Sequence, residues 1–278
     1  AYAIFQSVRF ILILIAVIVI IIIQLPSTHL GLSFALAEGL LFVALIIYVN
    51  SRVFRLRFSE TFSHWVREHL SFGSRGFLSG VFSEINTKVD VLMLGFFLSD
   101  AVVGLYSFAA ILAEGFGQLA TVFRRNVDPV LGHYLATGRT AELEEFSRKM
   151  VITVFKIVGT LGILGVAAYP LILIALVGSN QLRTSWLVFA TLVAGIVLSS
   201  GIRAFNGILL QGGHPGYHTL LIAIIVLSNV ALNAIFIPLW GTLGAATATA
   251  LVYQLQAFLL LVAAKKLLDI RLLSLCGK

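Results

Sequence analysis

Apolar residues follow one another in long runs along most of the chain, and short polar or glycine-containing breaks separate these runs. A run of about 20 apolar residues can cross the roughly 30 Å hydrocarbon core of a bilayer as a helix, because a helix satisfies its own backbone hydrogen bonds. The pattern predicts eight spans, near residues 8–24, 31–50, 75–98, 101–123, 151–176, 185–211, 217–238 and 242–264. We therefore expect an all-α fold, a polytopic transmembrane helical bundle.

The composition excludes an ordinary soluble domain. Hydrophobic residues make up 59% of the 278 residues and charged residues 11%, whereas soluble domains carry about 25% charged residues. The mean hydropathy is +1.04. The single cysteine, Cys276, cannot form an internal disulfide. Because the chain begins at Ala1, a few residues before an apolar run, we expect a fragment that lacks its true N-terminus.

Cations concentrate in the connections on one predicted side of the membrane. The segments 51–75 and 124–149 and the tail hold Arg52, Arg55, Arg57, Arg67, Arg75, Arg124, Arg125, Arg139, Arg148, Lys149, Lys265, Lys266, Arg271 and Lys278. The opposite connections contain only Arg183. Basic connections stay in the cytoplasm, so we expect both ends of the chain to be cytoplasmic.

The segment 51–74 separates the first two spans from the other six, and it is too charged to cross the membrane. Its apolar and basic residues alternate, which is typical of an amphipathic helix on the cytoplasmic face. A plain linker between two bundles fits the same pattern equally well.

Three charged residues lie inside the third predicted span. Glu84 and Lys88 are four residues apart, with the acid on the N-terminal side, which favours an ion pair on one helix face. Asp90 shares a different face with Ser83 and Asn86. An ionised group at the centre of a bilayer costs about 2.5–3.5 kcal/mol on insertion scales, so such residues face a partner or water.

Helix geometry places several of these polar groups at a similar depth. Lys88 lies about 15 Å and Glu114 about 20 Å from the turn at Ser99, at 1.5 Å per residue. We expect Lys88 to lie between Glu84 and Glu114, with Gln118 one turn below, around a polar cavity. A charge pair that only holds two helices in register is the alternative.

Two further cations lie in later spans. Arg203 falls near the cytoplasmic end of the sixth span, close to Asn206 and Gln211. It either reaches a wet cavity or extends to lipid headgroups. For Lys156, in the fifth span, the extension to headgroups is the better interpretation.

The sequence contains no recognisable enzyme signature. No phosphate-binding loop of the GxxxxGK[ST] type occurs, and the histidines have no spacing that indicates a metal site. We therefore expect no enzymatic activity, no cofactor, no metal and no nucleic-acid partner. The stretch GTLGAATATA (241–250) spaces small residues four apart, which favours close helix packing over a ligand role.

Three passages carry a resemblance to a known family: VDVLMLGFFLSDAVVGLYSFAA (89–110), FRRNVDPVLGHYLATGR (123–139) and LNAIFIPLWGTLGAATATALVYQ (232–254). Over about 200 residues the chain resembles the C-terminal bundle of the oligosaccharidyl-lipid flippases of the MATE-like superfamily, the polysaccharide biosynthesis transporters. The matching family positions are Asp90, Gly95, Val103, Gly104, Tyr106, Asn233, Ile237, Pro238, Gly241, Gly244, Ala245, Ala246, Ala248 and Thr249.

The resemblance implies two lobes of six helices around a central cavity. In that frame, residues 1–50 are two helices that end the N-terminal lobe, 51–74 a cytoplasmic linker, 75–266 the six-helix C-terminal lobe and 267–278 a cytoplasmic tail. The implied location is the cytoplasmic (inner) membrane of a prokaryote. The implied activity is alternating-access translocation of a polyprenyl-diphosphate-linked oligosaccharide, in contact with membrane lipids and coupled to protons or Na⁺.

Within that implied activity, each polar residue receives an expected role. Lys88, Arg203, Asn86 and Gln118 are the expected substrate-binding residues, and Glu84, Asp90 and Glu114 the expected coupling residues. Drug exporters of the same superfamily prefer acidic cavities, so a multidrug or toxin cation antiporter is the alternative. A membrane scaffold without transport activity is a third class.

Overall fold

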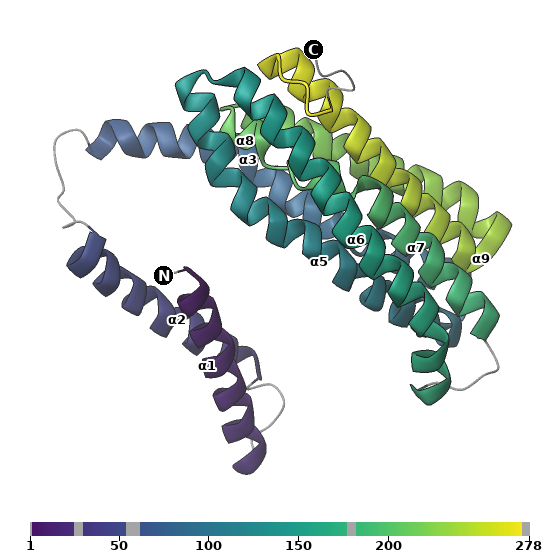
Figure 1. Cartoon of the computed structure of the whole chain (residues 1–278). Coiled ribbons are helices and arrows are strands. Elements are labelled where there is room, and N and C mark those ends of the chain that lie inside the picture. The colour runs from purple at the N-terminus through teal and green to yellow at the C-terminus, as the bar shows by residue number, and fades with distance from the viewer. Residues whose placement is uncertain (1, 25–29, 54–61, 177–181, 274–278) are drawn as a thin grey trace. The chain divides into compact units, whose positions relative to one another are not determined.

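The computed structural model describes residues 2–24, 30–53, 62–176 and 182–273 (Figure 1). The chain divides into two compact units, Ala1–Val66 and Arg67–Lys278. The predicted division at residues 50, 74 and 266 stays a prediction.

Unit 1 contains a pair of apolar helices. α1 runs over Tyr2–Ile22 and α2 over Leu30–Tyr48, and a π-helical turn, η2, follows at Val49–Val53. The rings of Phe5 and Tyr48 lie 5.4 Å apart, so the start of α1 meets the end of α2 and the two helices are antiparallel. Arg9 Nη2 and Glu38 Oε1, 2.5 Å apart, join them inside the apolar stretch.

Unit 2 contains the remaining helices, and α7 lies at their centre. α7 packs against α5, α6 and α9, and it buries Phe189, Leu192 and Ile196. The helices that extend into or lie within unit 2 are α3 (Phe62–Asn86), α4 (Val89–Phe97), α5 (Asp100–Thr137), α6 (Thr140–Leu176), α7 (Leu182–Arg203), α8 (Ile208–Gln211) and α9 (Pro215–Leu268).

The 54-residue helix α9 is two antiparallel helices joined at Gly241. Gly241 has φ 56° and ψ −131°, a conformation that glycine adopts without steric cost. A Cβ on Gly244 would lie 2.0 Å from the carbonyl oxygen of Phe236, eight residues away, which requires the chain to reverse. Similarly, a Cβ on Gly212 would lie 2.6 Å from Leu268, so both ends of α9 meet. The predicted break between two spans at residues 238–241 is confirmed.

The fold class is confirmed, with several boundaries different from those expected. In the described ranges, five helices are long and apolar enough to cross a membrane, with α9 counted once, and the apolar part of α1 is shorter. The third predicted span, 75–98, lies within a longer helical stretch, because α3 already begins at Phe62 and α4 follows it from Val89 to Phe97. The expected connection 124–149 is mostly helical, because α5 continues to Thr137 and α6 begins at Thr140.

The small residues of the stretch 241–250 lie in the helix interface, as expected. Ala245, Ala246 and Ala248 are fully buried. A Cβ on Gly195 of α7 would lie 2.7 Å from Cα of Ala250, so α7 and α9 approach to backbone contact. Such close approach lets helices associate in lipid without large apolar side chains between them.

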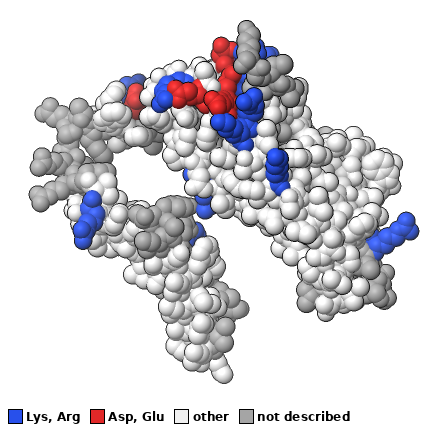
Figure 2. Space-filling model, viewed as in Figure 1, with Lys and Arg blue, Asp and Glu red and all other residues white. Residues whose placement is uncertain are grey.

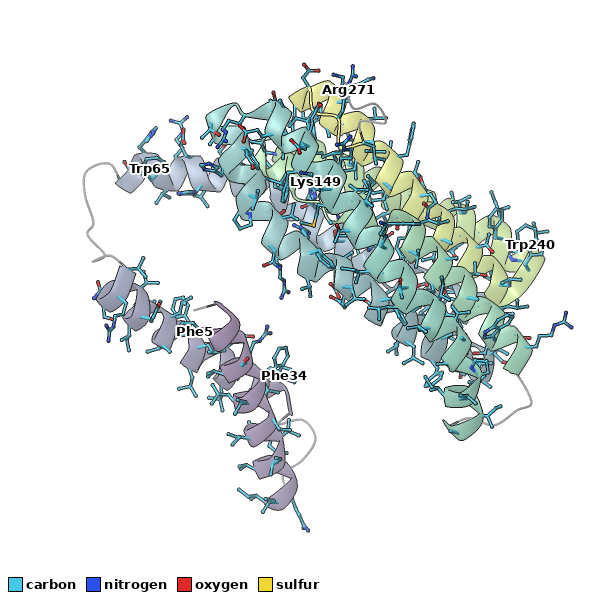
Figure 3. All side chains as sticks on the ribbon, viewed as in Figure 1. Phe5, Phe34, Trp65, Lys149, Trp240 and Arg271 are labelled. Atoms are coloured by element: carbon cyan, nitrogen blue, oxygen red, sulfur yellow. The ribbon has the colours of Figure 1, made fainter. Side chains whose placement is uncertain are left out.

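Charged side chains gather at one end of unit 2 (Figure 2). Exposed pairs there join Arg139 to Glu142 and Lys149 to Glu145. The hydrogen bond from Lys265 and its positive charge lower the pKa of Asp269. Figure 3 places Arg271 at this end and Trp240 at the opposite end of the unit. The cytoplasmic location of the charged end stays a prediction.

Candidate functional site

Polar side chains line a cavity of about 250 Å³ inside unit 2, which we call the polar cavity. Its wall comes from α3, α4, α5, α7, the α7–α8 turn and both halves of α9, whereas α6 contributes no lining residue. The polar lining residues are Ser83, Asn86, Thr87, Asp90, Glu114, Gln118, Thr121, Arg203, Asn206, Asn229, Thr249, Tyr253 and Gln256.

Two helix breaks border the polar cavity. α3 ends at Asn86 and α4 begins at Val89; between them the amides of Thr87 and Lys88 donate to carbonyls three residues back, at 3.2 and 3.0 Å. After Arg203, the amides of Phe205 and Asn206 bond in the same tight pattern, at 2.9 and 3.1 Å. Interrupted helices of this kind present backbone and side-chain polar groups at the binding sites of secondary transporters.

Arg203 brings a cation to the cavity wall. It is half-buried, and its guanidinium carbon lies 4.4 Å from the centroid of the Tyr253 ring. Its Nη1 is buried and has no hydrogen-bond partner among the described residues. A buried donor without a partner costs free energy, and a guanidinium binds carboxylate and phosphate oxygens in pairs. The wall therefore suits an anionic group at this point.

Asp90 is held in the cavity wall by two hydrogen bonds. Its Oδ2 accepts a hydrogen bond from the hydroxyl of Tyr106 at 2.5 Å, and its Oδ1 accepts from the amide of Val91 at 2.9 Å. Asp90 is only 7% exposed. Because Tyr106 belongs to α5, this pair of bonds ties the first turn of α4 to α5.

Two side chains of α9 carry oxygen atoms of the kind that hard cations bind. Thr249 lies beside the Tyr106 hydroxyl, and Thr249 Oγ1 and Asn233 Oδ1 are buried without hydrogen-bond partners in the described part. Hard cations prefer carboxylate, amide and hydroxyl oxygens. The described part of the chain contains no group of three or more histidine, cysteine or acidic residues suited to a metal.

A chain of amides connects α9 to the end of α3. Asn229 Nδ2 donates to Asn86 Oδ1 at 3.0 Å, and Asn233 Nδ2 donates to Asn229 Oδ1 at 2.8 Å. Sequence reasoning gave Asn229 no role, although two asparagines four residues apart in an apolar span are a usable signal. It also gave no role to Tyr253, which contacts Arg203, or to Gln256, which bonds Asn206 at 3.3 Å.

Five of the seven predicted site residues line the polar cavity: Asn86, Asp90, Glu114, Gln118 and Arg203. Glu84 and Lys88 do not line it, and both are exposed. The expected ion pair between them is wrong, because the described residues contain no such pair and the break after Asn86 interrupts the helical spacing. The expected position of Lys88 beside Glu114 in the cavity is wrong for the same reason. The roles of all seven residues stay predictions.

Long apolar helices around a polar chamber indicate a multi-pass membrane protein. No model of a known protein family matches the sequence. A relative, the probable flippase AglR of Haloferax volcanii, is 24% identical over 178 residues, which cover 62% of this chain and 36% of AglR.

A solved structure, the lipid II flippase MurJ in an inward closed conformation, matches the fold with a TM-score of 0.59 and 18% identity. The match covers 94% of this chain and 55% of MurJ, so the chain spans about half or less of the length of these two proteins. The MurJ likeness confirms the expected fold. Both matched proteins carry the name of a flippase, the class that the sequence resemblance indicated.

Proposed function

We propose that the chain is part of a flippase that moves a polyprenyl-diphosphate-linked oligosaccharide across the cytoplasmic membrane by alternating access. The unpartnered, buried Nη1 of Arg203 in the wall of the polar cavity is the observation that carries this proposal. The names of the two matched proteins support it, since both are flippases.

The chemistry of the wall fits the headgroup of such a lipid. The guanidinium of Arg203 would bind phosphate oxygens in a charge-assisted pair. The amides of Asn86 and Gln118 would exchange hydrogen bonds with sugar hydroxyls. The isoprenoid tail would stay in the bilayer. Lys88 remains a predicted substrate residue. Because its side chain is exposed and lies outside the cavity, it would contact the substrate only before or after the headgroup occupies the cavity.

The size of the polar cavity indicates one wall of a larger pathway. Its volume of about 250 Å³ is room for a group of water molecules or one small polar group. A diphosphate with several sugars is larger than this. We propose that the cavity widens when the second lobe of the flippase rocks away from it.

Coupling to protons or Na⁺ is a further part of the proposal. Asp90 is the best-placed group, because its carboxylate lines the cavity and bonds to Tyr106, which in turn lies beside Thr249 of the cavity wall. Glu114 lines the same cavity, whereas Glu84 is exposed outside it. We propose no enzymatic activity, no cofactor and no nucleic-acid partner, an inner-membrane location and cytoplasmic ends.

The antiporter alternative is less supported. Neither matched protein is a drug exporter. The polar cavity contains two acids, Asp90 and Glu114, and one cation, Arg203. A cavity for cationic drugs would gain nothing from the positive charge of Arg203, because like charges repel.

The test uses the complete flippase in proteoliposomes with a fluorescent polyprenyl-diphosphate-linked oligosaccharide. We expect Arg203→Gln to lower the translocation rate by about 10- to 100-fold, the value of a charge-assisted bond of 1.5–3 kcal/mol. Lys266→Gln is the matched control, since Lys266 is an exposed cation away from the cavity. Equal rates in both variants, with equal amounts of folded protein, would contradict the proposal.

A further inference from the structure

A second hollow lies on the outside of unit 2, between α6 and α7, and we call it the α6–α7 groove. Its volume is about 870 Å³. Its lining is almost entirely apolar and includes Phe155, Gly159, Ile163, Ala194 and Leu198. Ile163 is 73% and Leu198 64% exposed, so the groove opens toward the surroundings of the helices. It shares no lining residue with the polar cavity.

The dimensions of the groove match a lipid chain. Its α6 wall runs from Phe155 to Pro170, which is about 22 Å along a helix at 1.5 Å per residue. This length exceeds one leaflet of a hydrocarbon core roughly 30 Å thick. Trp186 stands at the Pro170 end, where its Nε1 donates to the carbonyl of Val166 at 3.0 Å and joins the two helices.

Lys156 gives the opposite end of the groove a positive charge. It is the one charged residue in the lining, it is exposed, and it forms no ion pair within the described ranges. A lysine inside an apolar span requires an anion or the headgroup region to accommodate its ammonium. Basic sites between transmembrane helices bind the phosphates of anionic lipids.

We propose that the α6–α7 groove binds one acyl chain of an anionic phospholipid, whose phosphate contacts Lys156. A resident phospholipid fits better than the tail of the transported lipid, because α6 contributes nothing to the polar cavity and the two hollows use different faces of α7. A second copy of the chain fits worse, because a symmetric contact through this groove would enclose two unpaired lysines.

The test is fluorescence quenching of Trp186 by brominated acyl chains. The complete chain carries Trp65→Phe and Trp240→Phe, so that Trp186 alone reports, and it is reconstituted in phosphatidylcholine vesicles with brominated phosphatidylglycerol or brominated phosphatidylcholine. We expect a roughly fivefold preference for the anionic lipid, the value of ~1 kcal/mol for one lysine at an anionic surface. Lys156→Gln should abolish the preference, and Lys149→Gln, the same change two turns away on α6, should leave it.

A second pair of variants keeps the proposal falsifiable if the charge change disturbs the helix. Ala194→Phe fills the groove and should weaken quenching by either lipid. Ala168→Phe adds the same ring at another exposed position, outside the groove, and should not.

Equal quenching by the two lipids in the parent protein, or a preference that survives Lys156→Gln, would overturn the proposal. Quenching that rises when the protein is diluted with lipid would show that a second copy covers the groove, and would also overturn it. Oligosaccharide translocation does not enter this test, so the groove and the proposed function fail or succeed separately.

Discussion

The polar cavity and the α6–α7 groove lie on two faces of the same helix, α7. They differ in volume and in the polarity of their lining. The groove has about 870 Å³ and an apolar lining, whereas the cavity has about 250 Å³ and a lining rich in amides, carboxylates and one guanidinium. The adjacent residues Val193 and Leu192 of α7 line the groove and the cavity, respectively.

The comparison shows that size does not identify the functional hollow in a membrane protein. An apolar hollow on a lipid-facing surface costs nothing to keep, because lipid chains fill it. A polar hollow inside an apolar bundle is costly, since each buried group needs a partner. The unpartnered groups are therefore more informative than the larger volume. The predictions below test whether the two faces of α7 differ as this argument requires.

The largest expected effect is a difference in stability between substitutions at two adjacent positions on α7, Gly195 and Ala194. Gly195→Val would push a side chain against the backbone of Ala250, 2.7 Å from the added Cβ, and overpacking of this kind costs about 1–3 kcal/mol or more. Ala194→Val makes a similar side chain on the exposed groove side and should change little. Thermal unfolding in detergent measures both. Equal loss of stability in the two variants would contradict the assignment of the faces.

A smaller effect is expected on the cavity side, at the bond between Tyr106 and Asp90. Tyr106→Phe removes the hydroxyl that donates to Asp90 at 2.5 Å, and a buried acceptor that loses its donor costs about 1–3 kcal/mol. Tyr217→Phe is the control, because Tyr217 is exposed on α9. Unfolding in detergent should distinguish the two. In the complete flippase, Tyr106→Phe should make the translocation rate independent of a proton or Na⁺ gradient. Tyr217→Phe should leave that dependence unchanged.

The smallest effect is expected at the far end of the groove. Trp186→Phe removes the donor to the Val166 carbonyl at 3.0 Å, a loss of about 0.5–1.5 kcal/mol for an ordinary hydrogen bond. Trp240→Phe, at the end of unit 2, is the matched control. We expect Trp186→Phe to lower the unfolding midpoint slightly more than the control does. A midpoint unchanged by Trp186→Phe would show that α6 and α7 need no clamp there.

The apolar pattern predicted the fold class because the bilayer leaves little choice of backbone structure. It placed the reversal at Gly241 correctly, since proline and glycine mark such breaks locally. It could not place the start of α3 at Phe62 or the end of α5 at Thr137, because a helix that leaves the membrane loses its apolar signal without losing its hydrogen bonds.

The site was predictable in part, because a charged residue is conspicuous in an apolar span. Asp90, Glu114 and Arg203 stand out as charges in apolar spans, and all three line the polar cavity. Lys88 stood out equally, but the helix break after Asn86 moves it off the expected face. Asn229 and Tyr253 carry no charge, and only the meeting of α9 with α3 and α7 gives them their partners.

The most direct test of the account is water access to the polar cavity. With Cys276 replaced by serine, Gln118→Cys places a thiol in the cavity wall and Thr160→Cys places one in the groove, both at exposed positions. In the complete flippase, we predict that a charged, membrane-impermeant thiol reagent modifies Gln118→Cys much faster than Thr160→Cys, and that the lipid-linked oligosaccharide slows only the former. Equal modification rates, or a cavity thiol that the oligosaccharide does not protect, would contradict the claim that this cavity receives the substrate headgroup.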